Sequence, residues 1–279
     1  MEHLILDKKP RNLFQEFLEI YSSLEAINSE EVSQLSKDIV RFYNGDLSAR
    51  NNLRDFMKLE VQWYDSLELN TPDYSVYGHK DYLSDLWACW VVYSRQYLKA
   101  IIKTNSLDGE KSALSLFQNV NSVLDLGCGL GYTTAALNQI FQCPTYGTNL
   151  EDTIQYAFCE KLATVYDFNI ITDTKELKKV DLVFASEYFE HILEPIEDLK
   201  TVLKLQPSYL IIANAFNAIA TGHFNKYIVH SDGSFTDLEN RIPNNKIGKL
   251  FNKELRDNGY VKIQTKLWNN RPSIWIKEN

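Results

Sequence analysis

The spacing of apolar residues predicts helices throughout the first 118 residues. Apolar side chains recur at i, i+3, i+4 and i+7 along one face of a first helix: Leu13, Phe14, Phe17, Leu18, Tyr21 and Leu24. A second helix is predicted from the capping signal at residues 28–31 to the glycine at position 45. A third pattern begins near Leu53 and ends at residues 70–73, where a proline and turn-forming residues stop a helix.

Residues 82–102 are apolar on almost every face, and their aromatic side chains are Tyr82, Trp87, Trp90, Tyr93 and Tyr97. A helix that lacks a polar face is buried when it belongs to a globular protein. The stretch therefore predicts one long helix inside the hydrophobic core, directly before the point at which the pattern of the chain changes.

From residue 119, short β-branched runs alternate with helical stretches, which is typical of repeated strand-helix units and a parallel sheet. Five strands are predicted, at residues 122–126, 145–149, 169–172, 180–185 and 209–214. Two later strands, at residues 260–267 and 273–277, flank a tight loop and predict an antiparallel pair. The predicted fold is α/β, with a Rossmann-like, mostly parallel sheet, an antiparallel C-terminal strand pair and a preceding all-helical region. The predicted boundary divides the chain into residues 1–118 and residues 119–279.

The composition restricts the classes of partner. The net charge is −8 and the pI is near 5.2, which disfavours a duplex nucleic acid and leaves small molecules or a basic protein partner open. No apolar run is long enough to span a membrane, and the N-terminus lacks the pattern of a secretory signal. The four cysteines have neither metal-binding nor disulfide spacing, so a reducing, cytoplasmic location is expected.

The sharpest signal is the run from Val123 to Tyr132, an apolar strand that contains Asp125 and is followed by Gly127, Gly129 and Gly131. Glycines allow the backbone to turn tightly and to approach a ligand with no Cβ in the way. The free N–H groups at the start of the following helix favour a polar or anionic ligand group. The run therefore predicts a site for a charged cofactor, and Asp125 suits a cofactor that carries an ammonium and a sulfonium.

This run and the strand spacing after it resemble the class I S-adenosylmethionine-dependent methyltransferases over roughly residues 119–279. The resemblance implies that S-adenosylmethionine is the cofactor and that the loop from Gly127 to Gly131 surrounds its methionine part. The cofactor-binding residues implied in this way are Asp125, Gly127, Cys128, Gly129, Gly131, Asn149, Leu150, Asp173, Thr174 and Ser186. The family usually has a carboxylate that accepts hydrogen bonds from the ribose hydroxyls where this chain has Asn149, whose neutral carbonyl oxygen is a weaker acceptor. Glu151 could take over this role.

Candidate catalytic residues follow the fourth predicted strand, at the sheet edge where open α/β sheets bind ligands. If this stretch begins a helix, Glu187, Glu190 and His191 share one face and could hold a divalent cation, to which His223 or His230 could add a ligand. The string is similar to that of metal-assisted O-methyltransferases acting on polyprenyl catechols and of small-RNA 2′-O-methyltransferases. Without a metal, His191 or His223 could be the general base, although either could equally be a surface or capping histidine.

Four residues are candidates for the acceptor site: Tyr77, Tyr82, Tyr188 and Asn214. Their alternative roles are core packing for the aromatic residues and loop stabilisation for Asn214. The sequence after the fourth strand lacks the paired prolines typical of enzymes that methylate nucleobase amines. We therefore expect methylation of a small molecule, at oxygen rather than at nitrogen. An RNA or protein methyltransferase and a non-catalytic cofactor-binding module are the alternatives.

Overall fold

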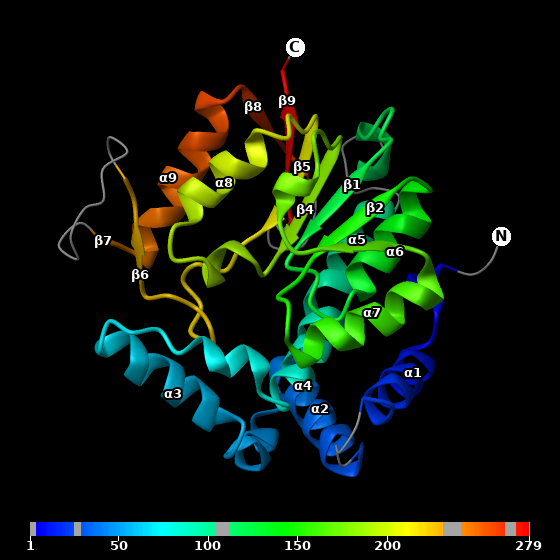
Figure 1. Cartoon of the computed structure of the whole chain (residues 1–279), viewed down its shortest axis with the longest axis vertical. Helices are drawn as coiled ribbons and strands as arrows, with labels where there is room; N and C mark the ends of the chain where they lie inside the picture. Colours follow the sequence, from blue (N-terminus) through cyan, green and yellow to red (C-terminus); the bar gives the residue numbers. More distant parts are fainter. Residues whose placement is uncertain (1–3, 25–28, 104–111, 231–240, 266–271, 279) are drawn as a thin grey trace.

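The computed structural model describes residues 4–24, 29–103, 112–230, 241–265 and 272–278 (Figure 1). Its centre is a seven-stranded sheet in the order β3-β2-β1-β4-β5-β9-β8. The first five strands are parallel: β1 (Val123–Leu126), β2 (Thr145–Thr148), β3 (Asn169–Ile171), β4 (Leu182–Ser186) and β5 (Tyr209–Ala213). The two last strands, β8 (Tyr260–Ile263) and β9 (Ser273–Lys277), are antiparallel to their neighbours. The predicted fold class is confirmed. Residues 266–271, which include the end of the predicted strand 260–267 and most of the loop after it, lie outside the described residues.

Helices cover both faces of the sheet because the side chains of each strand alternate between them. Val123 of β1 and Phe184 of β4 pack with α6 (Tyr132–Phe141) and α7 (Ile154–Tyr166) on one face. Leu124 of β1 and Val183 of β4 pack with α8 (Pro195–Leu203) and α9 (Asn244–Asp257) on the other face. A separate two-stranded ribbon, β6 (Lys226–Ile228) with β7 (Arg241–Pro243), precedes α9. The sheet thus has two hydrophobic cores.

The N-terminal region is helical, as predicted. It contains α1 (Pro10–Ser22), α2 (Ser29–Tyr43), α3 (Met57–Glu68), α4 (Tyr82–Cys89) and α5 (Arg95–Ile102), with short 3₁₀ turns at η1 (Ile5–Asp7), η2 (Leu47–Leu53), η3 (Tyr74–Gly78) and η6 (Ala113–Leu116). The third predicted helix begins later than expected, because η2 precedes α3. The stretch 82–102 is also not one regular helix, since a π-helical turn, η4 (Trp90–Ser94), separates α4 from α5.

This helical region shares both hydrophobic cores with the sheet. Phe17 of α1 stacks on Trp87 of α4 with ring centroids 4.9 Å apart, and its centroid is 5.6 Å from that of Phe158 of α7. In the other core, Trp63 of α3 and Tyr82 of α4 pack with residues of β1 and α8. Figure 1 shows α2, α3 and α4 below the sheet, so they close one end of it. The boundary near residue 118 stays a prediction.

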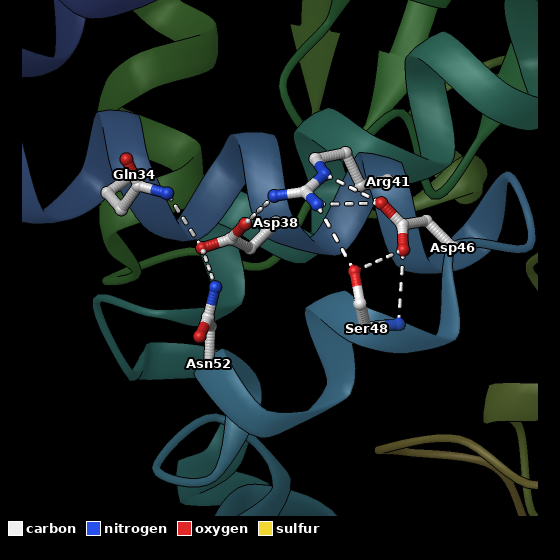
Figure 2. Close-up of polar contacts among 6 residues, drawn as sticks. All are labelled: Gln34, Asp38, Arg41, Asp46, Ser48 and Asn52. Atoms are coloured by element: carbon white, nitrogen blue, oxygen red, sulfur yellow. Dashed lines mark hydrogen bonds and ion pairs between the residues drawn. The ribbon is translucent and has the colours of Figure 1, made fainter.

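A buried carboxylate joins α2 to η2. Asp38 is 2% exposed and accepts hydrogen bonds from Gln34, Arg41 and Asn52 at 2.8, 3.0 and 3.2 Å (Figure 2). The guanidinium of Arg41 also forms an ion pair with Asp46, whose carboxylate caps the backbone N–H of Ser48. These contacts hold η2 against α2, which also packs on α4 through the hydrogen bond between the hydroxyls of Ser36 and Ser84.

Among the described residues, no helix has the length and apolar character needed to cross a bilayer.

Candidate functional site

A cavity of about 220 Å³ lies where the carboxyl ends of β1 and β4 meet α4 and η4. We call it the small cavity. On the sheet side it is lined by Asp125, by Glu187 and by residues of the loop from Gly127 to Gly131, which we call the glycine loop, and the loop after β5 adds His223. The helical region lines it with Tyr43, Tyr82, Asp85, Trp90, Tyr93 and Ser94. The small cavity is therefore built by both parts of the chain, at the edge where open α/β sheets bind ligands.

A second cavity of about 490 Å³, the large cavity, adjoins it along the carboxyl ends of β2 and β3. The two share the residues Tyr82, Leu86, Gly127, Gly129, Glu187 and His191. Asn149, Leu150, Glu151 and Gln155 line the large cavity further out. Together the cavities surround the glycine loop, with acidic and aromatic side chains at the inner end and a mostly apolar outer end to which Asn149, Glu151 and Gln155 add polar groups.

The glycine loop needs glycine at the position where it meets Tyr188. Gly127 has a φ of +64°, in the left-handed region, and a Cβ on it would overlap the ring of Tyr188. The backbone N–H of Cys128 donates to the carbonyl of Thr148 at 2.9 Å, which ties the loop to the end of β2. Tyr188, predicted to contact an acceptor, lines the large cavity and supports the loop. The loop is thus held on both sides before any ligand binds.

Asp125 is a buried carboxyl group that lines the small cavity. It is 2% exposed, and Oδ2 accepts a hydrogen bond from the hydroxyl of Thr134 at 2.7 Å. Burial raises the pKa of Asp125 to about 7, and the bond from Thr134 offsets the rise only in part. A cationic group beside this carboxyl would favour its ionised form.

Asn149, at the end of β2, uses both ends of its side-chain amide within the protein. Nδ2 donates to the carbonyl of Gly129 at 2.8 Å, and Oδ1 accepts from the backbone N–H of Leu150 at 2.9 Å. A carboxylate at this position could not donate to Gly129. The departure from the family's usual acid therefore has a local reason, because the amide joins the glycine loop to the β2 terminus.

Two buried histidines meet at the small cavity. The rings of His191 and His223 lie edge to face with centroids 4.6 Å apart, and both residues line this cavity. Nδ1 of His223 is 3.0 Å from the carbonyl of Ala218, which can only accept, so Nδ1 carries the proton and Nε2 has the free lone pair. Burial lowers the pKa of His223, while burial and the neighbouring His223 hold the pKa of His191 well below its ordinary value. Both imidazoles are neutral at pH 7.

Tyr77 and Tyr82, which the sequence predicts as acceptor contacts, both line the large cavity. The hydroxyl of Tyr77 is 3.2 Å from Nδ1 of His191 and 3.3 Å from the carbonyl of Gly222, to which it donates. Tyr82 lines both cavities. Because Tyr77 comes from η3 and Gly222 from the loop after β5, these contacts position His191 between the two parts of the chain.

The helix on which the metal hypothesis depends does not form. Glu187 has a φ of +53°, and a 3₁₀ turn, η8 (Phe189–His191), follows it. Glu190 points into the core, where Oε1 accepts from the backbone N–H of Ala215 at 2.7 Å and the residue is fully buried. Glu187 instead faces both cavities and accepts from the hydroxyl of Tyr97 at 3.4 Å. Within the part of the chain that the structure describes, no group of three or more acidic, histidine or cysteine side chains could hold a metal.

Several predicted residues lie away from the two cavities. Asp173 caps the 3₁₀ turn η7 (Thr174–Glu176), and neither Asp173 nor Thr174 lines a described cavity, whereas Thr172 lines the large one. Gly131 caps α6 behind the loop. Asn214 lines a separate cavity of about 270 Å³ beside α9 and β9. Of the remaining predicted cofactor residues, Cys128 and Ser186 line the small cavity and Leu150 lines the large one.

Asp85 and Ser94 both line the small cavity, and neither is among the residues predicted from the sequence. Asp85 is 6% exposed, and its Oδ1 accepts from the hydroxyl of Tyr43 at 2.8 Å. Burial raises the pKa of Asp85 to about 6. The hydroxyl of Ser94 is 3.0 Å from that of Ser186, so η4 contacts the end of β4. An acid within an otherwise apolar helix was the signal that could have identified Asp85, because burying a charge is costly.

A family model described as a methyltransferase domain matches residues 90–264, more than half of the chain. The fold is similar to that of a SAM dependent methyltransferase from Aquifex aeolicus, with a TM-score of 0.37, 15% identity, and coverage of 64% of this chain and 94% of that one. It is also similar to a proposed sarcosine dimethylglycine methyltransferase from Galdieria sulphuraria (TM-score 0.37, 13% identity, coverage of 55% and 58%). A third similar structure is the plantazolicin methyltransferase BpumL, solved with a pentazolic desmethylPZN analog and SAH (TM-score 0.35, 16% identity, coverage of 67% and 61%).

The chain spans less than two thirds of the length of the Galdieria sulphuraria and BpumL proteins. A search of curated protein sequences finds no match. The family assignment therefore depends on the sequence match over residues 90–264, and the strand order of the sheet agrees with it.

Proposed function

Because the chain belongs to the methyltransferase-domain family of S-adenosylmethionine-dependent enzymes, we propose that it methylates a hydroxyl oxygen of a small molecule bound in the small cavity. The observation that carries this proposal is the pair of buried, neutral imidazoles beside the glycine loop. A hydroxyl group must lose its proton as it accepts a methyl group, and a neutral imidazole is suited to take that proton.

The residues around the glycine loop fit the cofactor. S-adenosylmethionine supplies a methyl group on a sulfonium sulfur, and its amino-acid end carries an ammonium and a carboxylate. Asp125 is a buried carboxyl group that would bind the ammonium. The indole N–H of Trp90, a buried donor with no hydrogen-bond partner in the described structure, would donate to the carboxylate. The large cavity would hold the nucleoside, with Glu151 and Gln155 as candidates for its polar groups.

We assign the role of general base to His223. Its Nδ1–H is held by the carbonyl of Ala218, which leaves the lone pair of Nε2 for the acceptor hydroxyl. His191 packs edge to face against the His223 ring and is itself held by Tyr77, so it orients the base. Since transfer from a sulfonium is a direct displacement, alignment of the acceptor and exclusion of water supply most of the catalysis.

A second candidate is methylation of an amine. Asp85 and Glu187 both line the small cavity, and their carboxyl groups would bind an ammonium. An amine must reach the reaction without its extra proton, and the same imidazoles could accept that proton. The acidic lining of the small cavity is the observation that supports this alternative.

The acceptor class can be tested with radiolabelled S-adenosylmethionine and two matched panels, one of phenols and sugars and one of the corresponding amines. We expect methylated products from the hydroxyl panel, with turnover unchanged by a metal chelator. Products from the amine panel alone would replace the proposal by its alternative. Absence of product from both panels, with intact cofactor binding, would contradict a small-molecule acceptor from these classes.

Cofactor binding is expected to strengthen as the pH rises toward 7. Asp125 is protonated below its pKa of about 7 in the free protein, whereas an ammonium beside it favours the carboxylate. Binding therefore releases a proton below pH 7, and the affinity should fall by up to about tenfold per pH unit there and be constant above pH 8. Calorimetry with S-adenosylhomocysteine from pH 5.5 to 8.5 measures this slope. An equal slope in Asp125→Asn would show that another group is responsible.

Asn149→Asp is expected to weaken the binding of S-adenosylhomocysteine by about tenfold. The substitution removes the bond from Nδ2 to Gly129 and places a carboxylate oxygen against that carbonyl, at a cost of about 1–2 kcal/mol. Asn245→Asp, at an exposed position of α9, is the matched control and should leave binding unchanged. Tighter binding by Asn149→Asp would mean that residue 149 is a ribose acceptor.

A further inference from the structure

A groove of about 850 Å³ lies on the helical region, outside the two cavities of the proposed active site. Its lining residues come from the end of α2, from η4 and from α5: Tyr43, Asn44, Gly45, Val91, Val92, Tyr93, Gln96, Tyr97, Lys99, Ala100 and Lys103. We call it the tyrosine groove. Its volume is in the range of sites that bind small organic molecules.

The tyrosine groove adjoins the small cavity. Tyr43 and Tyr93 line both, with ring centroids 5.8 Å apart, and the Tyr97 ring centroid is 6.4 Å from that of Tyr93. The hydroxyl groups of two of these rings point to the acids of the small cavity, because Tyr43 donates to Asp85 and Tyr97 donates to Glu187. Three tyrosine rings thus form the boundary between the groove and the small cavity.

The π-helical turn η4 presents residues to both sides of this boundary. Trp90 and Ser94 line the small cavity, Val91 and Val92 line the groove, and Tyr93 lines both. A π turn adds a residue to the helical repeat and is frequent at functional sites. Five consecutive residues of this turn therefore line the two adjoining hollows.

The sign of the charge differs between the small cavity and the tyrosine groove. Asp85 and Glu187 lie at the inner end, in the small cavity, whereas Lys99 and Lys103 lie in the groove. Neither lysine forms an ion pair with any residue of the described structure. Asp7 is the acid that interacts with Lys99, and Arg95 is the nearby cation, whose guanidinium donates to the carbonyls of Leu6 and Lys8. Two lysines in one groove are a local positive feature on a protein with a net charge of −8.

We propose that the tyrosine groove binds the distal part of the methyl acceptor, and that the acceptor is an elongated molecule with an apolar or aromatic stem and an anionic end group. The stem lies against Tyr43, Tyr93 and Val92, and the anionic group lies at Lys99 and Lys103. The stem enters the small cavity beside Tyr43 and Tyr93, the two residues that line both hollows, and the reactive hydroxyl is then at the inner end. This inference names the acceptor class and so rests on the proposed function.

The test measures binding of ten-carbon probes by calorimetry to the full chain saturated with S-adenosylhomocysteine. The probes are decyl phosphate, decanoate, decanol and decyltrimethylammonium. We expect the two anions to bind at least about tenfold more tightly than the alcohol and the cation, because charge-assisted bonds add to the same apolar contact. A preference for decyl phosphate over decanoate would identify a phosphate end group, and the reverse a carboxylate.

Three variants show where the probes bind. The double variant Lys99→Glu, Lys103→Glu should reduce the affinity for both anions to that for decanol, and its affinity for decanol should equal that of the wild type. The charge-matched double variant Lys246→Glu, Lys249→Glu on α9 should bind all four probes as the wild type does. Gln96→Trp, at an exposed groove position, should weaken all probes by filling the groove. Equal affinity for all four probes, or unchanged anion binding in the Lys99 and Lys103 variant, would overturn the proposal. Binding of S-adenosylhomocysteine is measured separately. Failure of the wild type to bind S-adenosylhomocysteine would contradict the proposed function, whereas normal binding of it without anion preference would contradict only the groove proposal.

Discussion

Replacing His223 with glutamine is expected to lower kcat by about 10²- to 10⁴-fold, the usual contribution of a positioned general base. Glutamine is of similar size and can keep a bond to the carbonyl of Ala218, but its amide does not accept a proton near neutral pH. The wild type should lose activity only at a pH below the ordinary imidazole pKa of about 6.5, because burial lowers the pKa of His223 and keeps its ring neutral to a lower pH. The measurement is the pH profile of kcat with a hydroxyl acceptor from the panel.

The matched control is His79→Gln, since His79 is exposed and lines neither cavity. We expect its kcat and pH profile to equal those of the wild type. Binding of S-adenosylhomocysteine should be unchanged in both variants, which separates a loss of the base from a loss of the fold. A decrease of less than about threefold in His223→Gln would assign a structural role to this histidine.

Gly127→Ala is expected to abolish cofactor binding and to lower the free energy of unfolding by about 2–5 kcal/mol. About 1–2 kcal/mol comes from the left-handed backbone at a φ of +64°, and about 1–3 kcal/mol comes from the overlap between the new Cβ and Tyr188. The two measurements are urea unfolding and calorimetry with S-adenosylhomocysteine.

Gly259→Ala separates these two contributions. Gly259 has a φ of +81°, and a Cβ there would meet nothing within 4 Å, so its substitution imposes only the backbone strain. We expect a loss of about 1–2 kcal/mol and unchanged cofactor affinity. If both variants bind S-adenosylhomocysteine equally well, the contact between the glycine loop and Tyr188 does not position the cofactor.

The alternation of short apolar runs with helical stretches was sufficient to predict the sheet. Leu124 and Val183 face one core while Val123 and Phe184 face the other, and such fully buried strands have a strong hydrophobic signature. The glycine loop was equally clear, because its residues are adjacent in the sequence. Local patterns therefore identified the parts of the site that consist of one continuous segment.

The acceptor side could not be found in this way, because it depends on contacts between distant segments. Tyr77 meets His191 and Gly222, which are 114 and 145 residues further along the chain. Glu190 was assigned to a shared helical face with Glu187, but the left-handed backbone at Glu187 turns the chain and sends Glu190 into the core. Asn214 follows β5 as predicted, yet its side chain lies on the α9 side of the sheet. The spacing of apolar residues does not indicate where the backbone turns, as it does at Glu187, or which face of the sheet a polar side chain reaches.

The packing of Phe17 between Trp87 and Phe158 has a consequence for how new specificities can arise in this protein. Since the N-terminal helices supply part of the interior that the sheet needs, exchanging them for helices with different buried rings would leave that interior incompletely packed and lower the stability of the whole chain. Substitutions on the cavity-lining sides of α4, η4 and α5 leave the packing of Phe17 intact. Such substitutions are therefore the route to a different acceptor that costs the least stability.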